Sequence, residues 1–263
     1  MILWKSIVLP PTIRTIEEAS LNAWPARQQL VDDGWLIRCN DGYTRRANSV
    51  NPLYASASGE LELLKRVEKW ERFYRERGRP AIFKITPLAQ PTHLDTFLTE
   101  RGYRYEAPTG VRLRSLAEPL TPPDTLPDGH ALVESALSDA WLGSYTTFSA
   151  TPPETLPPMR AILENIAPAC CYVTQSVGGV PVACGLGVLE GALFGLYDIV
   201  TSPTQRGKGY GVHLLHTLLA WARAQGASHA YLAVMDDNAP ARRLYDKWGF
   251  VEVYKYWYRV RDW

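Results

Sequence analysis

The chain has 263 residues, 46% of them hydrophobic, and its formal net charge at pH 7 is +1. This length suits one large domain or two small ones, and the hydrophobic content is ample for a buried core. The small net charge excludes a nucleic-acid-binding protein held by bulk electrostatics. No run approaches the roughly 18 apolar residues of a membrane span, and residues 1–18 make no convincing signal peptide. We therefore expect a cytoplasmic protein without nucleic-acid or membrane partners.

The predicted elements of the first 118 residues alternate strands and helices. Turn and periodicity signals predict strands at 34–39 and 42–50, a helix at 59–78, a strand at 80–86, and a helix running into a strand at 93–106. Arg45 and Arg46 fall in the second strand. They could face an anionic substrate, but we expect them on a solvated strand face.

A proline-rich segment then interrupts the pattern. Residues 118–129, EPLTPPDTLPDG, hold four prolines and cannot continue a helix or strand. We predict a linker at 119–129 between a first lobe at 1–118 and a second lobe at 130–263.

The second lobe shows a regular alternation of elements. The pattern predicts a strand at 130–135, helices at 137–149 and around 159–166, strands at 169–177, 181–189 and 193–200, a helix from 212, a strand at 228–235, a helix at 238–249, and a final strand at 250–261 that can bend into two. Antiparallel strands followed by one crossover predict an α+β domain with a mixed sheet.

The cysteines and histidines of the chain do not predict a metal site. The cysteines have neither metal-ligand nor disulfide spacing and stand at Cys39, Cys170, Cys171 and Cys184. We expect buried thiols in a reducing compartment. His213 and His216 lie three residues apart, without further ligands at a useful spacing, and are expected to be partly exposed helix residues.

The most informative segment is Gln205–Gly211, QRGKGYG, between a strand and a helix. Glycines at alternate positions let backbone N–H groups gather at the positive end of the helix, which predicts a phosphate site. A dinucleotide-binding fold would need GxGxxG, a parallel sheet and an acidic residue about 20 positions later. A Walker loop would need GxxxxGK followed by Ser or Thr. Neither pattern is met.

A second segment, Asn238–Phe250 (NAPARRLYDKWGF), decides between these interpretations. The pairing of Arg206-x-x-Gly209-x-Gly211 with this segment resembles the GNAT superfamily of acyl-CoA-dependent N-acyltransferases. The resemblance covers about residues 130–263. The tandem layout is similar to bacterial two-lobe members with a degenerate first lobe. It implies tandem GNAT-like lobes, each a mixed, mostly antiparallel twisted sheet flanked by helices.

The resemblance implies acetyl-CoA as the acyl donor, with no metal. Backbone N–H groups of the glycine loop would wrap its pyrophosphate, where a Cβ would hold the oxygens away. The pantetheine arm would follow the preceding strand, whose N–H groups would stabilise the oxyanion. Thr201 departs from the family's usual valine, and Asn238 fits a helix N-cap as well as a cofactor contact. The predicted cofactor-binding residues are Ile199, Val200, Thr201, Arg206, Gly207, Lys208, Gly209, Tyr210, Gly211, Asn238 and Tyr245.

Two side chains are predicted to be catalytic. The resemblance places Tyr245 where it can protonate the departing sulfur, with packing at a helix–sheet junction as the alternative. Asp198 is the best carboxylate for a general base, because it lies beside the predicted cofactor and apolar neighbours would raise its pKa. Asp236, Asp237 or an ordered water are the alternatives. In the first lobe Leu98 replaces Tyr245, so we expect only one cofactor site and a structural or acceptor-shaping first lobe.

The acceptor is an amine that the sequence does not identify. Trp141, Tyr145 and Phe148 lie on the helix that the resemblance places at the acceptor side, but their spacing equally fits a core face. The leading interpretation is an N-acetyltransferase that moves acetyl to a primary amine by direct attack in a ternary complex. The alternative is a non-catalytic acyl-CoA-binding sensor, and a nucleotide-dependent oxidoreductase is a more distant one.

Overall fold

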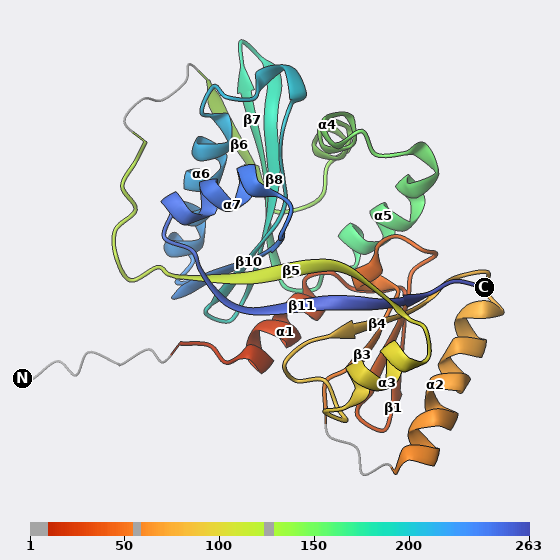
Figure 1. The fold of residues 1–263 in the computed structure, drawn as a ribbon. Helices are drawn as coiled ribbons and strands as arrows, with labels where there is room; N and C mark the ends of the chain where they lie inside the picture. Colours follow the sequence, from red (N-terminus) through yellow and green to blue (C-terminus); the bar gives the residue numbers. More distant parts are fainter. Residues whose placement is uncertain (1–9, 55–58, 124–128) are drawn as a thin grey trace, which may run out of the picture.

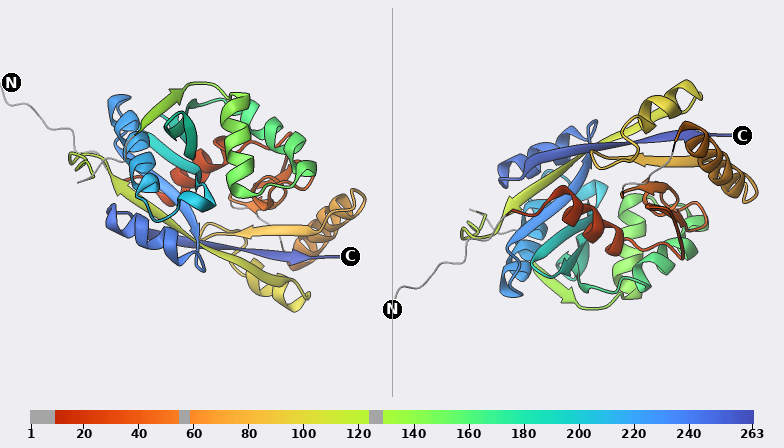
Figure 2. Two further views of the ribbon diagram at one scale, coloured as in Figure 1. Left: turned by 90° about the horizontal axis from the view of Figure 1, so that it is seen from above. Right: turned by 90° about the horizontal axis from the view of Figure 1, so that it is seen from below.

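One continuous twisted sheet, flanked by helices, joins the two halves of the molecule (Figures 1 and 2). The computed structural model describes residues 10–54, 59–123 and 129–263. Its eleven strands follow the order β1-β2-β3-β4-β11-β5-β10-β9-β8-β7-β6. Residues 1–9, which belong to the segment tested for a signal peptide, and residues 124–128 of the predicted linker lie outside the described residues. Within the described ranges no helix is long and apolar enough to cross a membrane.

The first half of the chain contains the elements predicted there, with one exception. The first half forms α1 (Ile13–Asn22), β1 (Gln28–Asp32), β2 (Trp35–Cys39), the 3-10 helix η1 (Arg45–Ala47), β3 (Val50–Pro52), α2 (Glu60–Arg75), β4 (Ala81–Ile85), α3 (Leu94–Glu100) and β5 (Arg104–Ser115). Of these, α1 and β1 lie where the sequence analysis predicts no element. The predicted strand at 42–50 is wrong. There the side chain of Asn48 accepts hydrogen bonds from the backbone N–H groups of Asn40 (2.7 Å) and Gly42 (3.0 Å), which replaces strand pairing with a compact turn.

The second half confirms every predicted strand and helix, with small shifts at their ends. Its elements are β6 (His130–Glu134), α4 (Asp139–Ser149), the 3-10 helix η2 (Pro153–Thr155), α5 (Leu156–Glu164), β7 (Ala169–Val177), β8 (Val180–Glu190), β9 (Leu193–Thr201), the 3-10 helix η3 (Pro203–Gln205), α6 (Tyr210–Ala224), β10 (His229–Met235), α7 (Ala239–Lys247) and β11 (Val251–Arg261). The predicted bend in the last segment corresponds to two register shifts in the pairing of β11 with β5.

The strands β5 and β11 exchange places at the centre of the sheet. β5, from the first half, lies between β10 and β11, while β11, from the second half, lies between β4 and β5. The order β3-α2-β4-α3-β5 recurs as β9-α6-β10-α7-β11, and in each case the strands around the first helix pair in parallel. The predicted mixed, mostly antiparallel sheet flanked by helices is confirmed, and its two parts join edge to edge. The division of the chain at 119–129 stays a prediction.

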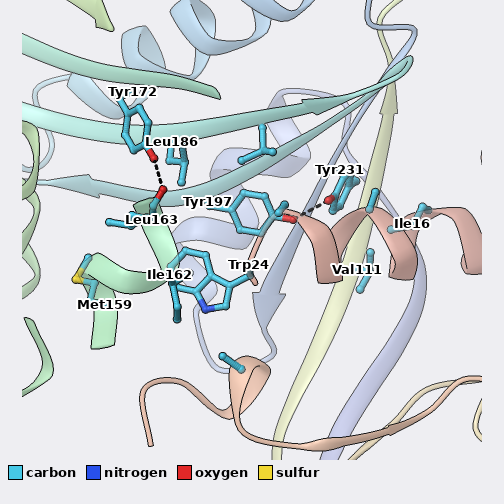
Figure 3. Close-up of a cluster of buried hydrophobic side chains, with 14 of the residues drawn as sticks. Ile16, Trp24, Val111, Met159, Ile162, Leu163, Tyr172, Leu186, Tyr197 and Tyr231 are labelled. Carbon is cyan, nitrogen blue, oxygen red and sulfur yellow. Dashed lines mark hydrogen bonds between the residues drawn. The ribbon is translucent and has the colours of Figure 1, made fainter. Parts of the chain in front are cut away.

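An aromatic core lies where the two halves meet. The ring of Trp24, which follows α1, stacks on Tyr197 of β9 with 6.1 Å between ring centroids. The hydroxyls of Tyr197 and Tyr231 are hydrogen-bonded at 2.6 Å, as Figure 3 shows. Trp24 and Trp141 are both fully buried. Aromatic side chains from both halves therefore hold the region around β9 in place.

Candidate active site

A pocket opens where β9 and β10 separate. Their parallel pairing ends at Leu196 and Leu232, although β9 continues to Thr201 and β10 to Met235. Beyond that point the facing edges of the two strands are not paired with each other. A pocket of about 830 Å³ lies in the opening. Splayed parallel strands thus leave backbone hydrogen-bonding groups available to a ligand.

A bulge in β9 accompanies the separation. The pairing of β9 with β8 shifts register so that Asp198 and Ile199 together oppose Gly185. Asp198 takes a φ of +50°, which aspartate tolerates better than most residues. A Cβ on Gly185 would lie 3.0 Å from Ile199 Cδ1 and 3.2 Å from Leu218 Cδ1, so a larger residue there would push these two side chains aside. The bulge makes Asp198 and Ile199 part of the pocket wall.

The carboxyl of Asp198 is buried, and only one of its two oxygens is hydrogen-bonded. Its Oδ1 accepts a hydrogen bond of 3.2 Å from the Tyr145 hydroxyl, and its buried Oδ2 has no partner among the described residues. Burial raises the pKa of Asp198 to about 6, although the nearby charge of Arg46 and the Tyr145 hydrogen bond act in the opposite direction. Tyr145 is itself held by Trp141, on which its ring stacks at 5.5 Å. At neutral pH this carboxylate is ionised but lies close to its pKa, as a general base requires.

Tyr245 projects from α7 into the same pocket. Its side chain packs edge-on against Phe250 at 5.9 Å and is 8% exposed. Burial raises the pKa of Tyr245 to about 12, so the side chain stays a phenol at physiological pH. Asn238 also lines the pocket, and its side chain accepts a hydrogen bond of 3.2 Å from the Ala241 N–H. The N-cap role of Asn238 is confirmed, and its contact with a cofactor stays a prediction.

The glycine loop has the form of an anion cradle. Gly207 and Gly209 adopt φ values of +79° and +84°, which strongly favour glycine. Within the described part of the chain no backbone carbonyl accepts a hydrogen bond from the N–H groups of Arg206–Gly211. No side chain caps α6, whose fifteen residues begin at Tyr210. Free N–H groups at the start of this helix form the local arrangement that binds phosphate.

The structure brings only some of the predicted cofactor residues into the pocket itself. Ile199, Asn238 and Tyr245 line it, together with the predicted base Asp198. Val200, Thr201 and the loop Arg206–Gly211 lie outside the lining. The loop follows β9 after the short 3-10 helix η3, and an added Cβ on Gly211 would lie 3.5 Å from Thr201 Oγ1. A long ligand that reaches the pocket along β9 would therefore meet the loop at its other end.

Residues from the first half also line the pocket. The segment at η1 and strand β5 contribute Thr44, Arg45, Arg46, Ala107 and Thr109, and β11 of the second half adds Tyr256 and Tyr258. The strand expected at Arg45 and Arg46 is wrong, because both begin the 3-10 helix η1. The Arg45 side chain is exposed to solvent as expected, whereas Arg46 is only partly exposed. The Arg46 guanidinium lies over the rings of Trp24 (4.5 Å) and Tyr197 (5.6 Å). No local sequence signal marks these contacts, because they depend on how the sheet joins the two halves.

The acceptor-side aromatic residues divide between core and pocket. Trp141 and Phe148 are buried in the core, and the Trp141 indole N–H donates to the carbonyls of Val173 and Gly185. Tyr145 alone of the three predicted residues lines the pocket. The core-face alternative therefore holds for Trp141 and Phe148, and an acceptor-side role of Tyr145 stays a prediction.

The remaining titratable residues lie partly in the pocket and partly elsewhere. Asp237 lines the pocket, whereas Asp236 accepts a hydrogen bond of 2.8 Å from Lys255. His213 is 6% exposed, so its expected partial exposure is wrong: it faces the core beneath α6, while His216 is partly exposed. All the cysteines are free thiols. Among the described residues no group of side chains could hold a metal ion.

Comparison with known proteins agrees with this geometry. A family model described as "Probable histone acetyltransferase Rv0428c C-terminal" matches residues 11–259. The chain belongs to this acetyltransferase family. The acetyltransferase is also 29% identical over 259 residues to the "Uncharacterized N-acetyltransferase YobR" of Bacillus subtilis (strain 168), over 95% of this chain and 98% of that protein.

Solved structures show the same fold. A GCN5-related N-acetyltransferase from Kribbella flavida superposes with a TM-score of 0.66 and 18% identity, over 95% of each chain. A tandem GNAT protein from the clavulanic acid biosynthesis pathway superposes with a TM-score of 0.63 and 11% identity, over 97% of this chain and 89% of that one. The predicted membership of the GNAT superfamily and the predicted fold are confirmed.

Proposed function

We propose that this acetyltransferase moves acetyl from acetyl-CoA to a primary amine by direct attack in a ternary complex. One observation supports this most strongly: the carboxylate of Asp198, with one oxygen free of hydrogen bonds, and the phenol of Tyr245 line one pocket between splayed strands. A general base and a proton donor are what amide formation from a thioester requires. The glycine loop beyond the end of β9 supplies the expected place for the pyrophosphate of the donor.

The residues of the chain fit an acyl-CoA substrate. Backbone N–H groups of Arg206–Gly211 would hold the pyrophosphate, with Lys208 and Arg206 adding positive charge nearby. The free edge of β9 at Ile199, Val200 and Thr201 would bind the pantetheine arm, and one of its N–H groups would stabilise the oxyanion. Asn238 would contact the arm while it caps α7.

The chemistry then follows from proton transfers at two residues. Asp198 takes a proton from the acceptor ammonium, which leaves a lone pair on nitrogen. As the bond from this nitrogen to the acetyl carbon forms, the carbon–sulfur bond breaks, and Tyr245 donates its proton to the departing sulfur, because burial keeps the phenol protonated. The second proton that the nitrogen loses as the amide forms restores the Tyr245 phenol, and Asp198 releases its proton to solvent. No cysteine of the described chain lines the pocket, so a covalent acyl-enzyme on cysteine is not part of this proposal.

The test of this function is release of free thiol from acetyl-CoA with a panel of amines. Tyr245→Phe should lower kcat about a hundredfold while the Kd for acetyl-CoA changes less than about threefold, because the lost hydroxyl acts in the transition state. Acetyl-CoA binding is measured by calorimetry on the same protein. Unchanged kcat in Tyr245→Phe would remove Tyr245 from the mechanism. Tight acetyl-CoA binding by the wild type without turnover of any amine would instead favour the acyl-CoA sensor.

A further inference from the structure

An unpaired cation lines the same pocket as the proposed base. The guanidinium carbon of Arg46 lies over the rings of Trp24 (4.5 Å) and Tyr197 (5.6 Å), and this contact uses none of its N–H groups as hydrogen-bond donors to a polar atom. Those N–H groups are therefore available to a ligand. No carboxylate of the described residues forms an ion pair with Arg46, whereas its neighbour Arg45 pairs with Glu106 at 2.7 Å.

The backbone around Arg46 is held firmly in this position. The buried guanidinium of Arg38 donates a hydrogen bond of 2.9 Å to the Arg46 carbonyl and one of 3.1 Å to the Leu21 carbonyl. It also donates to the carbonyl of Trp24, the residue on which Arg46 stacks. Arg38 therefore ties η1 to the end of α1 and fixes both the cation and its aromatic support. A charged side chain that is oriented in this way is preorganised for an anion.

Arg46 and Asp198 carry opposite charges in one pocket without contacting each other. Each influences the pKa of the other, so the two groups are close enough to interact through space. They nevertheless form no ion pair, and Asp198 keeps an unpartnered Oδ2. A pocket with separate positive and negative groups is complementary to a ligand that carries both charges.

We propose that the acceptor is an amine that also carries a carboxylate, with its nitrogen at Asp198 and its carboxylate bound by Arg46. This inference rests on the proposed function and identifies the substrate class of the same site. The planar edge of a guanidinium matches a carboxylate through two parallel N–H···O bonds. Binding at both ends would orient the amine for attack at the acetyl carbon. Arg46 is then a specificity-determining residue supplied by the first half of the chain.

The test compares matched acceptors in the thiol-release assay at pH 8. Each set contains an amino acid, its amide and the amine left after loss of the carboxylate, for example phenylalanine, phenylalaninamide and phenethylamine; a lysine-containing peptide is included. At pH 8 Asp198 of the wild type is ionised, since its pKa is about 6. Removal of Arg46 would raise that pKa, so the preference is measured as a ratio between acceptors within each variant, where protonation of Asp198 affects every acceptor alike. The wild type should favour the amino acid over the decarboxylated amine by about ten- to hundredfold in kcat/KM.

The variant Arg46→Met should abolish this preference, mainly by raising KM for the amino acid. Turnover of the decarboxylated amine should fall less than that of the amino acid, since that acceptor makes no carboxylate contact and loses only the effect of Arg46 on the Asp198 pKa. Arg46→Lys should retain part of the preference, because it keeps the charge without the planar fork. The control is Arg27→Met, which removes a cation from an exposed ion pair with Asp41 and should leave the preference intact.

The outcomes separate this inference from the proposed function. Amine turnover without preference for the carboxylate, best activity on the lysine-containing peptide, or a preference that survives in Arg46→Met would each overturn the inference alone. Absence of turnover for every amine would overturn the proposed function and the inference with it. Acetyl-CoA binding by each variant shows that the donor site is folded.

Discussion

At the scale of single residues, the environment of Asp198 decides whether it can act as a base. A carboxyl in water has a pKa near 4, and at pH 7 it would be a poor proton acceptor for an ammonium. The bulge in β9 places Asp198 where burial raises its pKa to about 6, and the Tyr145 hydrogen bond and the Arg46 charge limit that rise. The side chain thus gains basicity without losing its charge at neutral pH.

This environment predicts the pH dependence of the reaction. Below a pH of about 6 the Asp198 carboxyl is protonated and cannot accept a proton, so kcat/KM should fall about tenfold per pH unit on the acid side. Asp198→Asn should lower the rate at pH 7.5 and remove this acid limb. The measurement is a pH–rate profile of thiol release for both proteins. An acid limb that persists in Asp198→Asn would show that another group is the base, Asp237 being the next candidate in the pocket.

At the scale of elements, the start of α6 is built by backbone conformation more than by side chains. Gly207 and Gly209 both lie in the left-handed region, and a Cβ on either would meet no atom within 4 Å. Their glycine requirement is therefore conformational and not steric in the unliganded chain. The positive φ values turn successive N–H groups toward one side, which is how a loop without side-chain ligands can bind a phosphate.

The substitution Gly209→Ala should weaken acetyl-CoA binding about tenfold. Alanine at φ +84° costs about 1–2 kcal/mol, and relief of that strain would turn the N–H groups away from the pyrophosphate. The matched control is Gly226→Ala, at φ +88° and also free of neighbours, after the far end of α6. Calorimetric titration and thermal melting of both variants separate binding from stability. Equal loss of affinity in the two variants would show that general destabilisation, and not the cradle, is responsible.

At the scale of the whole molecule, the exchange of β5 and β11 binds the two halves together. β5 pairs with β10 along seven residues of that strand and also with β11. A buried side-chain contact also crosses the junction: Glu17 of α1, which accepts a hydrogen bond of 2.6 Å from Lys84 of β4, accepts another of 2.7 Å from Tyr254 of β11. The pocket likewise takes Arg46 from one half and Asp198 from the other. The first half thus contributes directly to the site.

This exchange predicts that the second half does not fold alone. A fragment of residues 130–263 lacks β5, so β10 and β11 would each expose a long unpaired edge, and such edges aggregate. We expect this fragment to be insoluble or to unfold without a cooperative transition. Co-expression with a fragment of residues 1–123, which supplies β5, should recover a soluble complex that binds acetyl-CoA. Isolated 130–263 that is monodisperse, melts cooperatively and binds acetyl-CoA would contradict this expectation.

The sequence by itself determined the order of elements in the second half and the segment that carries the glycine loop. Turns, periodicity and glycine spacing are local properties, so β6 to β11 and the start of α6 could be read from residues close together in the chain. The same local reasoning failed at residues 42–50, where the side chain of Asn48 stabilises a turn. The tertiary structure alone decided that Arg46 reaches the pocket and that β5 and β11 exchange places. Both depend on contacts between residues far apart in the chain, and such contacts produce no periodic pattern in the sequence.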